Sequence, residues 1–110
     1  MSAILVFCTC PDDASADRIA TALVQQRLAA CVNRIGGVVS TYRWKGSVQR
    51  DSEVLLLIKS TRDRYAALRD AIVAAHPYEL PEAIAVDIAL GLDRYLAWIG
   101  AETTPDASAG

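Results

Sequence analysis

Apolar and polar positions follow two periods along this chain, one typical of strands and one typical of helices. Apolar and β-branched runs predict four strands, at 3–9, 30–44, 48–60 and 83–90. Apolar residues at helical spacing predict helices at about 13–28 and 62–75, and a short closing helix at 92–99. Leaving the closing helix aside, the predicted order of elements is β-α-β-β-α-β.

Turn and cap residues mark several ends of these elements. Gly36-Gly37 favours a bend in the second strand, and the segment 44–47 favours a tight turn into the third. Thr61 is the expected N-cap of the second long helix. That helix has to end by His76, because the residue before Pro77 is disfavoured in the helical conformation.

The predicted order is the ferredoxin-like split arrangement, an α+β fold with a four-stranded antiparallel sheet and two helices on one face. The third strand is apolar in both phases, with Val54, Leu56 and Ile58 alternating with Leu55 and Leu57. Both faces of the sheet are therefore expected to be covered. Strands of about 13 residues would span about 40 Å, whereas a domain of this size has a radius of gyration of about 13 Å. The long hairpin favours a homo-oligomer in which neighbouring copies cover it.

Composition places the chain among small globular domains. Its 110 residues are 53% hydrophobic and carry a net charge of −2. We expect one domain over 1–102 and a flexible tail over 103–110. No basic stripe favours nucleic acid, and the apolar start at 3–7 is too short for a signal or membrane segment. The odd count of three cysteines is typical of reduced thiols and predicts a cytoplasmic protein.

The segment His76-Pro77-Tyr78-Glu79-Leu80-Pro81-Glu82 concentrates polar chemistry on a stiff frame. It holds the single histidine of the chain and two of its four prolines. Loops that present polar groups from a rigid frame often bind ligands, and a neutral imidazole is a common metal ligand. The alternative interpretation is a proline-stiffened connection between two core elements.

Cys8 and Cys10 are a second candidate for metal binding. Residues two apart on a strand face the same way, so both sulfurs could approach one soft metal ion. Free cysteine also packs as a small buried hydrophobe, which is the simpler interpretation. Cys31 is expected in the core. Either strand-one thiol could pair with His76 as a nucleophile and base, but no phosphate loop, G-x-S-x-G or paired-acid motif occurs, and the sequence predicts no enzyme.

Lys59 is the one charge that closes the apolar block of the third strand. Lysine is rarely fully buried without a partner, so the simplest expectation is exposure at the strand end. Two alternatives are a pair with Glu79 or Glu82, and a place in a pocket between subunits that binds a small anion.

Several segments in series resemble the CutA family of divalent-cation tolerance proteins. They are Phe7–Pro11, Leu28–Asn33, Ser40–Gly46, Glu53–Lys59, His76–Glu82 and Tyr95–Trp98. The resemblance covers 3–99 and implies a cytoplasmic homotrimer, similar in architecture to the nitrogen-regulatory PII proteins, that binds copper(II) or a similar divalent cation. The implied ligands are Cys8 and His76. Ala75 stands where some members carry a second histidine, which implies a weaker metal site here.

The resemblance leaves two other functions open. One is a PII-like sensor that binds a small anionic effector in clefts between subunits, with cleft residues Lys59, Tyr78, Glu79 and Glu82. The other is a trimeric scaffold without a ligand of its own. In either case Tyr42, Trp44 and Trp98 are candidates for trimer or structural contacts.

Overall fold

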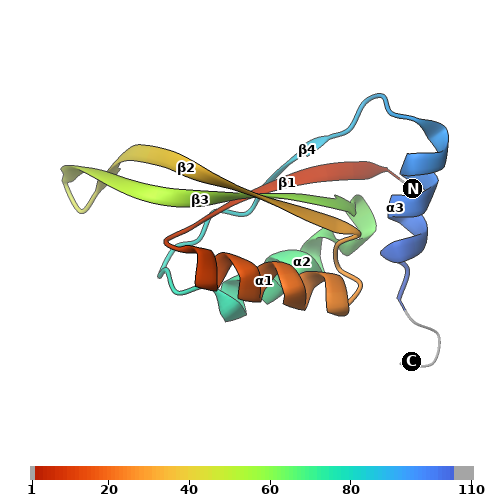
Figure 1. The fold of residues 1–110 in the computed structure, drawn as a ribbon, viewed down its shortest axis with the longest axis horizontal. Helices are drawn as coiled ribbons and strands as arrows, with labels where there is room; N and C mark the ends of the chain where they lie inside the picture. The colour runs from red at the N-terminus through yellow and green to blue at the C-terminus, as the bar shows by residue number, and fades with distance from the viewer. Residues whose placement is uncertain (1, 106–110) are drawn as a thin grey trace.

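The computed structural model describes residues 2–105 of the chain. Figure 1 shows a twisted antiparallel sheet with two long helices beneath it and a third helix at its end. The elements in chain order are β1 (Ala3–Cys10), α1 (Asp13–Gln25), β2 (Cys31–Trp44), β3 (Ser47–Thr61), α2 (Arg62–Ala75), β4 (Ile84–Asp87) and α3 (Asp93–Glu102). The predicted ferredoxin-like α+β order is confirmed, with α3 as an addition to it.

The sheet has the strand order β2-β3-β1-β4, so β2 and β4 form its edges. Every second residue of β1 is buried under the helices, from Ile4 to Cys10, as the strand period of two requires. Leu56 and Ile58 of β3 extend this layer, and Leu68 and Ile72 of α2 close it from below. The core therefore lies between one sheet face and the two long helices.

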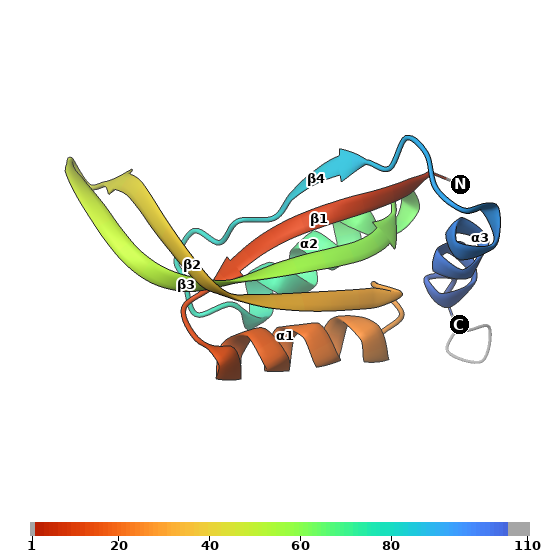
Figure 2. The ribbon, with the colours of Figure 1, turned by 45° about the horizontal axis from the view of Figure 1, so that its top comes forward.

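The β2–β3 hairpin extends beyond the helices, as Figures 1 and 2 show. Its register shifts between Ile35 and Val38, where Gly37 has a φ of 78°, so the bend expected at the two glycines is confirmed. Lys45 and Gly46 form the turn with φ angles of 49° and 84°. The longest dimension of the molecule is 46 Å and its radius of gyration is 14.6 Å, more than the roughly 13 Å of a compact domain of this length.

Three predicted details are wrong at element ends. Helix α1 stops at Gln25 rather than near residue 28, because Arg27 adopts a left-handed φ of 58°. Strand β4 is four residues long, Ile84–Asp87, rather than 83–90, and it pairs with Ile4 to Phe7 of β1. The predicted N-cap position of Thr61 on α2 is confirmed, although its side chain makes no capping bond. Helix α3 runs three residues past the predicted end.

The second sheet face is only partly covered within this subunit. Leu5, Phe7, Leu55 and Leu57 lie half-buried on it, and α3 stands at the end of the sheet where β1 begins (Figure 2). Cys31 also lies on this face, opposite Lys59 in the strand register. The expected burial of Cys31 in the core is therefore wrong for the subunit, since its side chain is half-exposed.

The end of α3 is fastened to the loop after α1. Arg27 donates from Nε to the Thr104 carbonyl at 2.7 Å and from Nη2 to the Ala101 carbonyl at 2.8 Å. Thr103 is buried and donates from its hydroxyl to the Ile99 carbonyl at 2.7 Å. Of the tail expected over 103–110, these first residues are packed, and 106–110 lie outside the described residues. Within residues 2–105 no helix is both long and apolar enough to span a bilayer.

Candidate functional site

Two cysteines and the histidine meet where β1 ends. Cys8 and Cys10 face the helices from neighbouring positions on the buried side of β1, and His76 follows the last residue of α2. Their candidate ligand atoms all lie within 4.8 Å of one another. Both cysteines are 0% exposed and His76 is 8% exposed. Two soft sulfur donors and one imidazole therefore share a small space closed to solvent.

Both ring nitrogens of His76 already make hydrogen bonds. The Tyr78 backbone N–H donates to Nδ1 at 3.1 Å, and Nε2 lies 2.8 Å from the Thr9 carbonyl oxygen. Because the first bond needs an acceptor and the second a donor, the imidazole is neutral with its proton on Nε2. The carbonyl that receives this proton belongs to the residue between the two cysteines.

The two thiols affect each other directly. A hydrogen bond to Cys10, together with burial, raises the pKa of Cys8 far above its ordinary value. The same bond lowers the pKa of Cys10, against the opposing effect of burial, and the charge of Arg18 helps to lower it. Cys10 is therefore the stronger acid of the pair, and the Cys8 thiol lies 3.9 Å from the Thr9 carbonyl oxygen, to which it donates.

Tyr78 fastens the loop 76–82 to β3. Its hydroxyl donates to Oε2 of Glu53 at 2.7 Å, and its ring lies 4.7 Å from that of His76, centroid to centroid. Burial, followed by the bond to Glu53, raises the pKa of the Tyr78 phenol. Burial and the charge of Glu53 also raise the pKa of Glu82. The stiff corner expected from the prolines thus acts as a lid over the end of β1.

The other predicted cleft residues do not gather into one place within the subunit. Lys59 lies six positions beyond Glu53 on β3, about 20 Å away at 3.3 Å per residue. Its Nζ donates to the Tyr95 hydroxyl at 3.2 Å and lies 5.5 Å from the centre of that ring. Glu79 is exposed at the loop surface. A cleft that combines Lys59 with Glu79 or Glu82 needs a second subunit and stays a prediction.

The aromatic residues predicted for trimer or structural contacts lie at both ends of the molecule. Tyr42 is on the projecting hairpin and donates from its hydroxyl to Asp51. Trp44 lies at the hairpin turn, with the Lys45 ammonium 5.8 Å from its ring centre. Trp98 is 41% exposed on α3, beside Tyr95. All three leave ring surface uncovered, and their role in trimer contacts stays a prediction.

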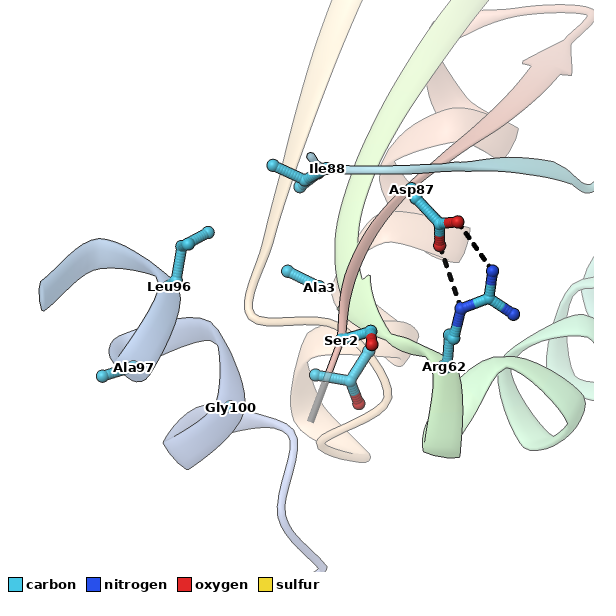
Figure 3. A pocket seen from close by; sticks show the side chains of 9 residues that line it. Ser2, Ala3, Arg62, Asp87, Ile88, Leu96, Ala97 and Gly100 are labelled. Atoms are coloured by element: carbon cyan, nitrogen blue, oxygen red, sulfur yellow. Dashed lines mark hydrogen bonds and ion pairs between the residues drawn. The ribbon is translucent and has the colours of Figure 1, made fainter. Parts of the chain in front are cut away.

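A larger cavity lies beside α3, far from the cysteines. It has a volume of about 740 Å³ and is lined by residues of β1, α2, α3 and the end of β4. Figure 3 shows the Arg62 guanidinium and the Asp87 carboxylate facing each other at its side. The two bonds between them, at 2.9 and 2.7 Å, neutralise both charges. The lining offers neither a thiol nor an imidazole, and its carboxylate, Asp87, is held by Arg62.

The sequence reasoning found all three residues of the buried cluster but missed one residue beside it. The resemblance implied Cys8 and His76 as ligands, and the structure adds Cys10 to them. Its signal was the spacing of two residues along a strand, which places both sulfurs on one face. Glu53 was missed altogether, because nothing in the sequence indicates that Tyr78 reaches it from a distant loop.

Comparisons with known proteins agree with one another. The family model described as CutA1 divalent ion tolerance protein matches residues 4–102. The divalent-cation tolerance protein CutA of Thermus thermophilus is 46% identical over 99 residues, which are 90% of this chain and 96% of that protein. Protein CutA of Homo sapiens is 46% identical over 84% of this chain, which spans only 52% of that longer protein.

Solved structures show the same fold. The crystal structure of CutA from Xylella fastidiosa superposes with a TM-score of 0.92 at 48% identity, covering 94% of this chain and 100% of that one. The structure of the divalent cation tolerance protein from Thermus thermophilus gives 0.91 at 44% identity, over 93% and 99% of the two chains. The predicted family is thereby confirmed. The chain belongs to the CutA1 divalent ion tolerance protein family.

Proposed function

We propose that this protein is a cytoplasmic, homotrimeric, non-enzymatic binder of copper(II) or a similar divalent cation. The observation that carries the proposal is the cluster of Cys8, Cys10 and His76, whose donor atoms lie within 4.8 Å of one another. Imidazole is a common copper ligand, and a cysteine thiolate joins histidine in the blue-copper sites of other proteins. The divalent-cation tolerance that relatives carry in their names supports the same conclusion.

The donor atoms of this cluster are of types that bind metal ions, but three residues are fewer than a full set of ligands. Cys8 and Cys10 would supply sulfur ligands and His76 a nitrogen, and the bound ion would serve as cargo rather than as a reagent. Ala75 occupies the position beside His76 and adds no ligand. Cys31 lies on the opposite sheet face, because its partner in the strand register is Lys59, which is on the face away from the helices. It is therefore a matched control for the two candidate thiols.

Copper titration tests this proposal. We expect wild type and Cys31→Ala to bind copper(II) with the same stoichiometry under anaerobic conditions, and Cys8→Ala and His76→Ala to bind less or more weakly. Equilibrium dialysis with metal analysis measures bound copper per subunit. Equal binding by all four proteins would contradict the assignment of the site.

The open sheet face supports the homotrimer. Val86 and Ile84 of β4 are 51% and 60% exposed, and they lie beside the half-buried Leu5 and Phe7 in the strand register. Apolar patches of this kind mark association surfaces. The edge strands β2 and β4 also carry unpaired backbone groups at opposite sides of the sheet. An edge-to-edge contact between such strands joins different surfaces of two copies, and repeating it closes a ring.

Light scattering on the purified protein tests the trimer. We expect a mass of three times 11.8 kDa, and a monomer would refute the proposal. Val86→Glu places a charge on the proposed contact face and should lower the mass. Val73→Glu introduces the same charge on α2, where Val73 is 57% exposed, and should leave the mass unchanged.

A further inference from the structure

We infer that the cluster at the end of β1 is a two-coordinate copper(I) site, with the Cys8 and Cys10 sulfurs as its ligands and His76 as a positioning residue. This inference deepens the proposed function, because it uses the same cluster and names the ion that the cluster holds best. It departs from the expectation of a divalent cation. Two features of the structure carry it.

The first feature is that His76 has no free nitrogen. Nδ1 accepts from the Tyr78 N–H at 3.1 Å and Nε2 faces the Thr9 carbonyl at 2.8 Å. A metal that used either nitrogen would have to break one of these bonds inside a buried site, and a buried group left unpaired costs about 1–3 kcal/mol. The two sulfurs are the donors that a metal can use without disturbing the imidazole.

The second feature is the lack of further ligands around the sulfurs. Within residues 2–105 no carboxylate joins the cluster, and both cysteines are 0% exposed, so solvent cannot complete a coordination shell. A closed zinc site takes about four ligands at metal–sulfur distances of about 2.3 Å, and copper(II) favours a tetragonal set of nitrogen and oxygen. Because the two sulfurs lie within 4.8 Å of each other, one ion between them can contact both at a metal–sulfur distance of about 2.3 Å.

Binding of copper(I) to both cysteines as thiolates releases two protons to solvent and leaves a complex with one net negative charge.

His76 then acts on the site through the backbone. Its Nε2–H holds the carbonyl of Thr9, which lies between the two ligand residues in the chain, and this bond fixes the peptide from which both sulfurs project. Residues that orient ligands without binding the metal contribute about 10–100-fold to affinity. Loss of one of the two sulfur ligands should lower the affinity for copper(I) far more than loss of such an orienting residue.

Anaerobic copper(I) binding in competition with a chelator of known affinity tests the inference. We expect wild type and Cys31→Ala to hold one copper(I) per subunit. Cys8→Ala and Cys10→Ala should both lose the ion to the chelator. His76→Gln should keep the full stoichiometry with an affinity lower by no more than about 100-fold. Circular dichroism of each variant checks that it is folded.

X-ray absorption spectroscopy of the copper(I)-loaded protein reports which atoms bind copper. This result distinguishes a metal ligand from a residue with a purely structural role. We expect scattering from two sulfurs and no imidazole, in wild type and in His76→Gln alike. An imidazole shell in wild type, or tighter binding of copper(II) than of copper(I), would overturn the inference while leaving the proposed function in place. Failure of the wild type to bind either ion would remove both.

Discussion

The bond between Tyr78 and Glu53 should measurably stabilise the protein. Glu53 is 8% exposed, and within residues 2–105 its one side-chain hydrogen bond comes from the Tyr78 hydroxyl at 2.7 Å. Tyr78→Phe removes that donor and leaves a buried carboxylate unpaired. Hydrogen bonds to charged groups contribute about 1.5–3 kcal/mol. Since Tyr78 is itself half-exposed, we expect the lower end, a loss of about 1.5 kcal/mol in the free energy of unfolding.

Tyr42→Phe is the matched control for this prediction. It removes the same kind of bond, from a tyrosine hydroxyl to Asp51, but on the exposed surface of the hairpin. Solvent replaces the lost partner in the subunit, and phenylalanine keeps the ring that is a candidate for trimer contacts, so this variant should lose less stability than Tyr78→Phe. Urea unfolding at one fixed protein concentration measures both changes, because oligomer stability depends on concentration. Equal losses in the two variants would refute the claim that burial of Glu53 gives the Tyr78 bond its effect.

Three further predictions test the fold. Leu56→Ala opens a cavity at a fully buried position of β3 and should lower the free energy of unfolding in urea by about 3 kcal/mol; a loss below about 1 kcal/mol would contradict the packing. Gly37→Ala forces a side chain into a φ of 78° and should lower stability, whereas Gly36→Ala should be the milder of the two. The bonds from Arg62 lower the pKa of Asp87 below its ordinary value of 3.8, so the carboxylate stabilises the protein above that pH and loses this effect as the pH falls. Thermal melts should therefore show a constant advantage of wild type over Asp87→Asn above about pH 5 that disappears in strong acid; an advantage that grows in acid would contradict the ion pair.

The elements could be predicted from the sequence because their signals are local. The alternation of Val54, Leu56 and Ile58 with Leu55 and Leu57 identified β3 as apolar on both faces, and the paired glycines located the bulge in β2. These patterns depend only on neighbouring residues. Tertiary contacts decided the rest. Strand β4 is limited to the four residues that pair with Ile4 to Phe7 of β1, and α1 ends where Arg27 turns to bind the C-terminal end of α3.

The same division holds for the candidate site. The spacing of Cys8 and Cys10 on a strand and the position of His76 after a helix were visible in the sequence, and the structure brings all three within 4.8 Å. Their hydrogen bonds were not visible. No local pattern indicates that His76 reaches Thr9 across 67 positions of the chain. The residue types were therefore predictable, whereas the partners that determine their chemistry were not.

That difference changes the role of the histidine more than that of the cysteines. An isolated imidazole beside a thiol is a good metal ligand by residue type alone. The Nε2 bond to the Thr9 carbonyl joins the loop 76–82 to β1, whereas the Nδ1 bond to the Tyr78 N–H lies within the loop. Access of an ion to the sulfurs then requires this loop to open, since both cysteines are closed to solvent. Metal uptake and loop opening should therefore be linked, because opening breaks the bond of His76 Nε2 to Thr9 and the bond of Tyr78 to Glu53.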